Sequence, residues 1–284
     1  MSRFDRNERF FGVEGQRRLR CSSAAVIGAG GLGTHVIQQH AHLGVGRLVI
    51  IDPDMQEESN KNRNVGSHAS DPHGVLAKVD VAERLVKAID PEIGVETIQA
   101  SVLSEEALRR IQTVDYVFGC VDMDGARLVL TEHCLAFDRT YFDLASDIHV
   151  EANVYGGRVF VTTGAGGCLV CQGELDPVAA REDLENPHAR KDRIEIYGIP
   201  IDLLTEPGPS VVSINAVVAS LAVTEFMVHA TGIRPAHRLL EYRADQGIVK
   251  RKILTPNPDC YYCKEVYRLG ERAGTFRYAR VAHT

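Results

Sequence analysis

The sequence predicts an α/β protein built on a doubly wound, mainly parallel sheet that is extended by antiparallel strands. Between residues 24 and 146, short apolar runs alternate with segments whose apolar residues recur at helical spacing. This alternation is typical of parallel strands joined by helices. After residue 149 the pattern changes to β-hairpin-like stretches at 150–163 and 239–254. Antiparallel strands commonly extend a parallel sheet in large α/β proteins.

The parallel part is expected to contain five strands and four helices. The strands are expected at 24–28, 48–52, 95–100, 116–122 and 141–145, and the helices at 31–42, 75–89, 104–111 and 123–137. Beyond it we expect a hairpin around Gly156-Gly157, a β region over 239–254 that is broken at 245–247, and a long apolar helix over 210–232. The polar stretch 172–207 is expected to be a mobile surface crossover loop.

Composition excludes some classes of protein. The chain has 284 residues, of which 44% are hydrophobic, and this suits one large domain or two small ones. A net charge of −6 argues against nucleic-acid binding. We find no apolar run that approaches the ~20 residues of a membrane span, and the polar N-terminus lacks a signal core. We therefore expect a cytoplasmic protein with neither a nucleic-acid nor a membrane partner.

A glycine cluster between the first strand and the first helix is the strongest local motif. Its glycines are Gly28, Gly30, Gly31 and Gly33. Glycine lets the backbone approach a phosphate closely, and a helix N-terminus favours negative charge. Asp52, at the end of the second strand, is placed to accept hydrogen bonds from ribose hydroxyls. The motif predicts a Rossmann-like nucleotide site, most often for a nicotinamide or flavin, unless the glycines serve only a tight turn.

Three further positions are candidates for phosphate or magnesium binding. The polar loop over 52–66 leaves the carboxyl end of a parallel strand, where Arg63 offers a planar fork of donors and Asn60 can bond phosphate or sugar. Spacing alone leaves open a solvated charged loop. Lys78 lies in the first turn of a helix, where a cation is unfavourable unless an anion is near, although most single surface lysines bind nothing. Asp122 ends the fourth strand, and carboxylates hold Mg²⁺ against phosphates.

Four of the seven cysteines form two pairs, Cys168-Leu-Val-Cys171 and Cys260-Tyr-Tyr-Cys263. Each pair directs two thiolates to one point, and four thiolates make a closed, structural zinc site. The alternatives are redox pairs or ordinary buried cysteines. The remaining cysteines, Cys21, Cys120 and Cys134, are expected to be small core residues.

Taken together, these motifs resemble the ThiF/MoeB/HesA family, the ubiquitin-activating-enzyme-like adenylyltransferases. The resemblance covers nearly the whole chain and is carried by the glycine loop, Asp52-Pro-Asp54, the Ser59–Arg63 segment, Lys78, Asp122 and the two cysteine pairs. In this family the glycine loop holds ATP, which replaces the expectation of a nicotinamide. The resemblance implies one integrated adenylation domain with a helical arm at 1–22, an ATP-binding Rossmann-like part at 23–147, and an antiparallel, zinc-binding part at 148–284.

The resemblance also implies a role for each residue. Gly31 and its neighbours Gly28, Gly30 and Gly33 pack against the nucleotide, with Asp54 and Ser59 beside it. Asp52 takes the ribose. The phosphates are held by Asn60, Arg63 and Lys78, and Mg²⁺ by Asp122. Arg6 corresponds to an arginine that enters the partner protomer's site, so a homodimer is implied, although by position alone the arginines of the arm are equally a solvated basic helix.

The implied reaction is attack of a C-terminal carboxylate on the α-phosphorus of ATP, which gives an acyl adenylate and pyrophosphate. In this family the carboxylate usually belongs to the Gly-Gly tail of a ubiquitin-like or sulfur-carrier protein. Positioning and charge neutralisation suffice, and the ionised carboxylate needs no general base. The alternatives are adenylation of a peptide or small-molecule carboxylate, an NAD-dependent oxidoreductase, and a non-catalytic nucleotide-binding scaffold.

Three departures from the family pattern stand out. The fourth strand ends in Asp122-Met123 where Asp-Asn is usual, and Asn64 follows Arg63 where glutamine is common. Residues 172–259 contain no cysteine. We therefore predict adenylation without a covalent cysteine intermediate in the crossover loop.

Overall fold

A computed structural model describes residues 2–164, 166–184 and 208–283. Its strands are β1 (Ser23–Ile27), β2 (Arg47–Ile51), β3 (Gly94–Ile98), β4 (Tyr116–Gly119), β5 (Thr140–His149), β6 (Val154–Thr162), β7 (Leu239–Arg243) and β8 (Ile248–Arg251). Its α-helices are α1 (Asp5–Cys21), α2 (Gly31–Leu43), α3 (Lys78–Ile89), α4 (Glu105–Ile111), α5 (Asp124–Ala136), α6 (Pro177–Asp183) and α9 (Val212–Thr231). Short helical turns are η1 (Glu58–Asn60), η2 (Tyr262–Val266), η3 (Gly270–Ala273) and η4 (Thr275–His283).

All eight strands form one sheet in the order β3-β2-β1-β4-β5-β6-β7-β8. The first five strands of this order are parallel, and β1 lies between β2 and β4. Along β1, Ala25 and Ile27 pack into the core on one face while Ala24 and Val26 pack into the core on the other. Burial on both faces explains why these strands are continuously apolar in sequence. The predicted fold class is confirmed.

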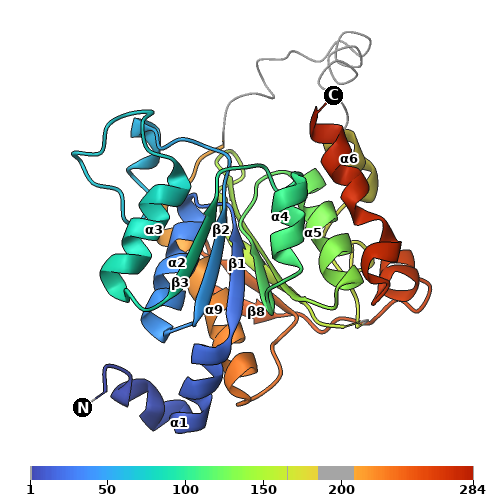
Figure 1. Ribbon diagram of the computed structural model, residues 1–284. Helices are drawn as coiled ribbons and strands as arrows, with labels where there is room; N and C mark the ends of the chain where they lie inside the picture. Colours follow the sequence, from blue (N-terminus) through green and yellow to red (C-terminus); the bar gives the residue numbers. More distant parts are fainter. Residues whose placement is uncertain (1, 165, 185–207, 284) are drawn as a thin grey trace.

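Helices cover both faces of the sheet, with α2, α3 and α9 on one side and α4 and α5 on the other (Figure 1). The chain runs outward from β1 through β2 to β3 and then returns to β4 on the other side of β1. The strand order therefore reverses between β1 and β4, and the carboxyl ends of strands at such a reversal are the usual ligand position in α/β sheets. The glycine loop leaves β1 at that point.

The antiparallel extension corrects one prediction. The hairpin does not turn at Gly156-Gly157, because β5 continues to His149 and both glycines lie inside β6. A Cβ atom on Gly157 would lie 2.6 Å from the Val218 side chain of α9, and one on Gly156 would collide with the Tyr242 carbonyl of β7. The two glycines therefore serve close packing within the sheet rather than a turn.

Two smaller expectations are also corrected. Within the stretch expected to be a surface loop, residues 177–183 form α6, which begins where the Asp176 side chain accepts a hydrogen bond from the Val178 N–H at 2.8 Å. This helix packs closely on Gly125 of α5; residues 185–207 of that stretch lie outside the described residues. Cys21 is exposed rather than part of the core, since it ends α1 just before the sheet begins.

Helix α9 corrects the statement that no apolar run reaches membrane length. It has 20 residues, and its most apolar 18-residue window has a mean hydropathy of 1.5, so length and composition alone would let it cross a membrane. In this fold it is a core helix. Val218, Ala222 and Phe226 are fully enclosed, and the Phe226 ring lies 5.7 Å from that of Phe118 on the sheet.

Because the sheet approaches α9 so closely at Gly157, we predict that Gly157→Ala lowers the free energy of unfolding by about 1–3 kcal/mol through overpacking. Gly94→Ala is the matched control, since a Cβ there would meet its nearest neighbour at 3.7 Å. Urea unfolding of both variants measures the difference. Equal stability of the two variants would contradict the assignment of Gly157 to a packing role.

Candidate functional site

The glycine loop allows the end of β1, the start of α2 and the end of β4 to pack closely together. Gly28 has φ +93°, and a Cβ on it would lie 2.5 Å from the Cys120 carbonyl oxygen beyond β4. A Cβ on Gly33 would collide with the Gly28 carbonyl, so this glycine packs helix against strand. Gly30 precedes the helix, and a Cβ on it would meet no atom of the described residues within 4 Å. The approach to the helix N-terminus at Gly30 is therefore open to a ligand, as a phosphate site requires.

Asp52 locks the glycine loop to the end of β2. Its Oδ2 accepts a hydrogen bond from the Ala29 N–H at 2.6 Å, and its Oδ1 accepts one from the Asp54 N–H at 2.8 Å. The residue is only 4% exposed. Burial raises the pKa of Asp52 above its ordinary value, while the charge of Lys78 partly opposes the rise. Asp52 thus follows β2 at the carboxyl end of the sheet, as the sequence predicts. The structure shows in addition that this side chain holds the glycine loop in position.

Lys78 is brought to the same edge by an ion pair. Its Nζ lies 2.6 Å from Oδ2 of Asp54, and its backbone N–H donates to the Asp54 carbonyl at 3.0 Å. As the first residue of α3, Lys78 has a charge that the helix dipole opposes. The Asp54 carboxylate compensates for this opposition. The side chain of Asp54 is 61% exposed and that of Lys78 only 13%, so the carboxylate faces solvent while the lysine is mostly covered.

The segment 57–71 brings Arg63 to the glycine loop, and Ser59 and Asn60 form the turn before it. Asn60 Oδ1 accepts a hydrogen bond from the Glu57 N–H at 3.0 Å, which fixes the turn η1. Arg63 Nη1 donates to the Ser59 carbonyl at 2.7 Å, and a Cβ on Gly31 would lie 3.2 Å from Arg63 Cδ. The stem of this arginine therefore lies directly beside the first residue of α2.

Two anchors hold the segment 57–71 in place. Near its middle, the Val65 N–H donates to Thr34 Oγ1 of α2 at 3.1 Å. At its end, Arg84 of α3 makes a bidentate pair with Asp71 at 2.8 and 2.7 Å. This hydrogen-bonded guanidinium holds the pKa of Asp71 well below its usual range.

Asp122 follows β4 at the same end of the sheet. It is exposed and has no ion-pair partner among the residues that the structure describes. The carbonyl of the preceding residue, Val121, accepts a hydrogen bond from Arg127 Nη2 at 2.6 Å. An exposed, unpaired carboxylate is the kind of oxygen ligand that Mg²⁺ takes in proteins.

A buried charge network that the sequence prediction missed supports this loop. Arg127 and Arg158 each place Nη1 2.6 Å from Oδ2 of Asp143, and Tyr141 donates to Oδ1 at 2.8 Å. Burial alone would raise the pKa of Asp143, but the two arginines outweigh it and hold the pKa below its ordinary value. The available signal was the presence of charged residues within an otherwise apolar helix and strand.

The structure thus gathers the glycine loop, Asp52, Asp54, Arg63 and Lys78 at one end of the sheet. Arg6 lies elsewhere: it is exposed on α1, which packs at the opposite end of the strands (Figure 1).

The cysteines outside the pairs offer no activated thiol at this edge. Burial raises the pKa of Cys120 and of Cys134, which disfavours their thiolates. Cys21 is exposed but precedes β1, at the end of the sheet opposite to the glycine loop.

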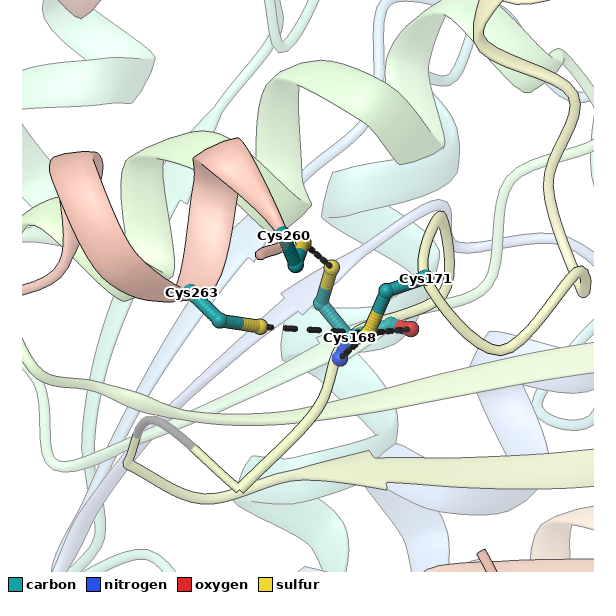
Figure 2. A group of neighbouring side chains, drawn as sticks. All are labelled: Cys168, Cys171, Cys260 and Cys263. Carbon is teal, nitrogen blue, oxygen red and sulfur yellow. Dashed lines mark hydrogen bonds between the residues drawn. The ribbon is translucent and has the colours of Figure 1, made fainter. Parts of the chain in front are cut away.

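The two cysteine pairs meet in space. All four sulfur atoms lie within 4.8 Å of one another, with Cys168 Sγ 3.8 Å from Cys260 Sγ and Cys171 Sγ 4.0 Å from Cys263 Sγ (Figure 2). Sulfur atoms on a tetrahedral zinc ion are separated by about 3.8 Å, so the donor set fits Zn²⁺. Such a closed site would tie the segment after β6 to the segment after β8.

The family follows from comparison with known proteins. The model of the ThiF family matches residues 4–262. The chain belongs to the ThiF family. This confirms the family predicted from the sequence motifs and, at the level of the family, an enzyme of the adenylyltransferase class.

Among relatives of this ThiF-family chain, ubiquitin-like modifier-activating enzyme 5 of Drosophila mojavensis is 24% identical over 88% of the chain and 61% of the relative. SAMP-activating enzyme E1 of Haloferax volcanii is 37% identical over 56% of each. The chain thus spans about 60% of the length of the first of these relatives. Among solved structures, E. coli MccB with MccA-N7isoASN superposes with a TM-score of 0.74 at 19% identity, covering 93% of this chain and 75% of that one. This likeness shows a shared fold.

The Asp71–Arg84 pair predicts a pH-dependent anchor. Because the pKa of Asp71 is lowered in the folded state, its contribution to stability is present above about pH 4 and is lost as the pH falls below that value. We predict that Asp71→Asn lowers the free energy of unfolding by about 1 kcal/mol at pH 7, a value discounted for the partly exposed Arg84. The difference between variant and wild type should shrink toward pH 2.

Urea unfolding between pH 7 and pH 2 checks this. Glu58→Gln, which removes an exposed pair with Lys61 in the same segment, is the control and should change stability by less than about 0.5 kcal/mol. A difference for Asp71→Asn that stays constant over the whole range would show that the ion pair does not anchor the segment.

Proposed function

We propose that the chain is an ATP- and Mg²⁺-dependent adenylyltransferase that activates the C-terminal carboxylate of a ubiquitin-like or sulfur-carrier protein. The observation that supports this most is that Asp52, Arg63 and Lys78 lie at the end of the sheet where α2 begins: Asp52 holds the glycine loop, Arg63 lies beside Gly31, and Lys78 lies close enough to act on the Asp52 charge. The three residues come from three different segments. Arg63 and Lys78 supply two positive charges, which is more than a ribose or a nicotinamide ring requires. A polyphosphate is the ligand that uses them all.

Each residue then has a part in the reaction. Asp52 binds the ribose, while Asn60, Arg63 and Lys78 hold the phosphates in line for attack at the α-phosphorus. Asp122 holds Mg²⁺, which would neutralise the charge that develops on the phosphate oxygens. The incoming carboxylate is already ionised at neutral pH, so no general base is required. The residues act by positioning and by electrostatic stabilisation, which is how most phosphoryl-type transfers are catalysed.

The partner and metal assignments belong to the same proposal. Arg6 cannot serve the site of its own chain from the opposite end of the sheet, so we propose that it reaches the site of a second copy in a homodimer. The four cysteines would hold a structural zinc ion, whose thiolates leave no position open for substrate. We further propose that the protein works in the cytoplasm.

A second candidate is adenylation of a peptide carboxylate. Two observations favour it: the structural neighbours include MccB in complex with MccA, and the chain has no cysteine in 172–259 that would receive an acyl group. An oxidoreductase is less well supported, because the chain matches the ThiF family of adenylyltransferases. A non-catalytic scaffold would also bind ATP, but it would support no exchange.

ATP–pyrophosphate exchange tests the proposal. We predict exchange that depends on a small protein ending in Gly-Gly, and a loss of about 10²–10³-fold in Arg63→Ala and in Lys78→Ala. Lys87→Ala, at the far end of the same helix α3, is the control and should retain exchange.

The outcome also separates the candidates. Exchange supported by short peptides but by no Gly-Gly protein would favour the peptide function. An absence of exchange with either class, together with binding of NAD, would refute adenylation.

A further inference from the structure

A buried amide with an unpaired atom lies beside the glycine loop. Asn215, in the first turn of α9, is 1% exposed. Its Nδ2 donates to Ser210 Oγ at 3.0 Å, but its Oδ1 has no hydrogen-bond partner among the residues that the structure describes. A buried carbonyl oxygen without a partner is costly to a fold, and a ligand that completes it is a physical reason for its presence.

The amide of Asn215 fits against α2 because Gly31 has no side chain. A Cβ on Gly31 would collide with Asn215 Nδ2 and would lie 3.2 Å from Arg63 Cδ. The Asn215 amide therefore rests on the first residue of α2, next to the stem of Arg63. This is the helix N-terminus at which the proposed function seats the phosphates, and the first turn of α9 thereby becomes a wall of that site.

The unpaired atom is an acceptor, and this restricts its partner. Phosphate and carboxylate oxygens are acceptors themselves and cannot pair with it. Among the proposed reactants, the donors are the ribose hydroxyls, the adenine amino group, and the backbone N–H of the substrate. The ribose hydroxyls already have Asp52 as their proposed acceptor.

Distance favours the last of these donors. The attacking carboxylate oxygen must come within roughly 3–3.5 Å of phosphorus. The N–H of the same residue lies within about one residue's length, roughly 3.5 Å, of that carboxylate. The Asn215 amide rests on the first residue of α2 through its Nδ2, and its Oδ1 belongs to the same small group, close to where the phosphates are proposed to bind. The adenine ring, by contrast, lies on the far side of the ribose from the phosphates.

We propose that Asn215 is a further substrate-binding residue whose Oδ1 accepts the backbone N–H of the C-terminal residue of the substrate. This inference rests on the proposed adenylation and narrows the substrate class. The substrate is then a protein or peptide that ends in a residue with a free amide N–H. Terminal proline, hydroxy acids and simple fatty acids lack that donor and are disfavoured.

Two stable mimics of the acyl adenylate isolate this hydrogen bond. One is N-acetylglycyl-sulfamoyladenosine, and the other is its ester isostere, in which oxygen replaces the amide N–H. By calorimetry, we expect the wild-type protein to bind the amide probe about tenfold more tightly than the ester. In Asn215→Leu the ratio should fall to about one, while the affinity for a non-hydrolysable ATP analogue stays within twofold of wild type.

Ser220→Ala is the matched control. Ser220 is on the same helix, five residues or about one and a half turns after Asn215, and it accepts a hydrogen bond from Gln39 of α2 at 3.1 Å. This variant should keep the tenfold ratio. The wild-type comparison of the two probes needs no variant, so the inference remains testable if Asn215→Leu does not fold.

Each other outcome is decisive. Equal affinity of the wild-type protein for both probes, or a tenfold ratio retained in Asn215→Leu, overturns the inference but leaves adenylation intact. Loss of affinity for the ATP analogue in Asn215→Leu would assign the amide to the nucleotide instead. Failure of the wild-type protein to bind either probe would count against the proposed function itself.

Discussion

A buried carboxylate, that of Asp52, holds the candidate site together. Its two oxygens accept backbone N–H groups from the glycine loop and from the start of the next segment, so one side chain fixes the end of β1 relative to the end of β2. Burial makes the charge costly, and the two hydrogen bonds and the nearby Lys78 offset that cost. The positions of Asp54 and Lys78 follow from this arrangement, because both depend on where the chain leaves β2.

The features that the sequence predicted correctly are those with local causes. Continuous apolar runs separated by helical periods determine a parallel sheet, and the carboxyl ends of its central strands must share one edge. Asp52 and Asp122, which each follow a strand, could therefore be assigned to that edge without coordinates. The same holds for the cysteine pairs, since the short spacing within each pair limits how its thiolates can point.

What the sequence could not supply depends on contacts between distant segments. Gly156 and Gly157 have the signature of a turn, and only the approach of α9 and β7 shows that they pack within a strand. Asn215 is one amide in an apolar helix, and its role is suggested only when Gly31, 184 positions earlier, is found beneath it. The exposure of Cys21, by contrast, has a local cause, because polar residues surround it in the sequence and it ends α1 ahead of β1.

The central claim is that side chains from four separate segments surround a triphosphate. The structure of the protein with Mg²⁺ and an ATP analogue whose α,β-bridge is methylene tests this most directly. We expect phosphate oxygens within hydrogen-bonding distance of Arg63 and Lys78, ribose hydroxyls on Asp52, and the metal ion at Asp122. A nucleotide bound elsewhere, or a triphosphate at the glycine loop that touches neither Arg63 nor Lys78, would contradict it.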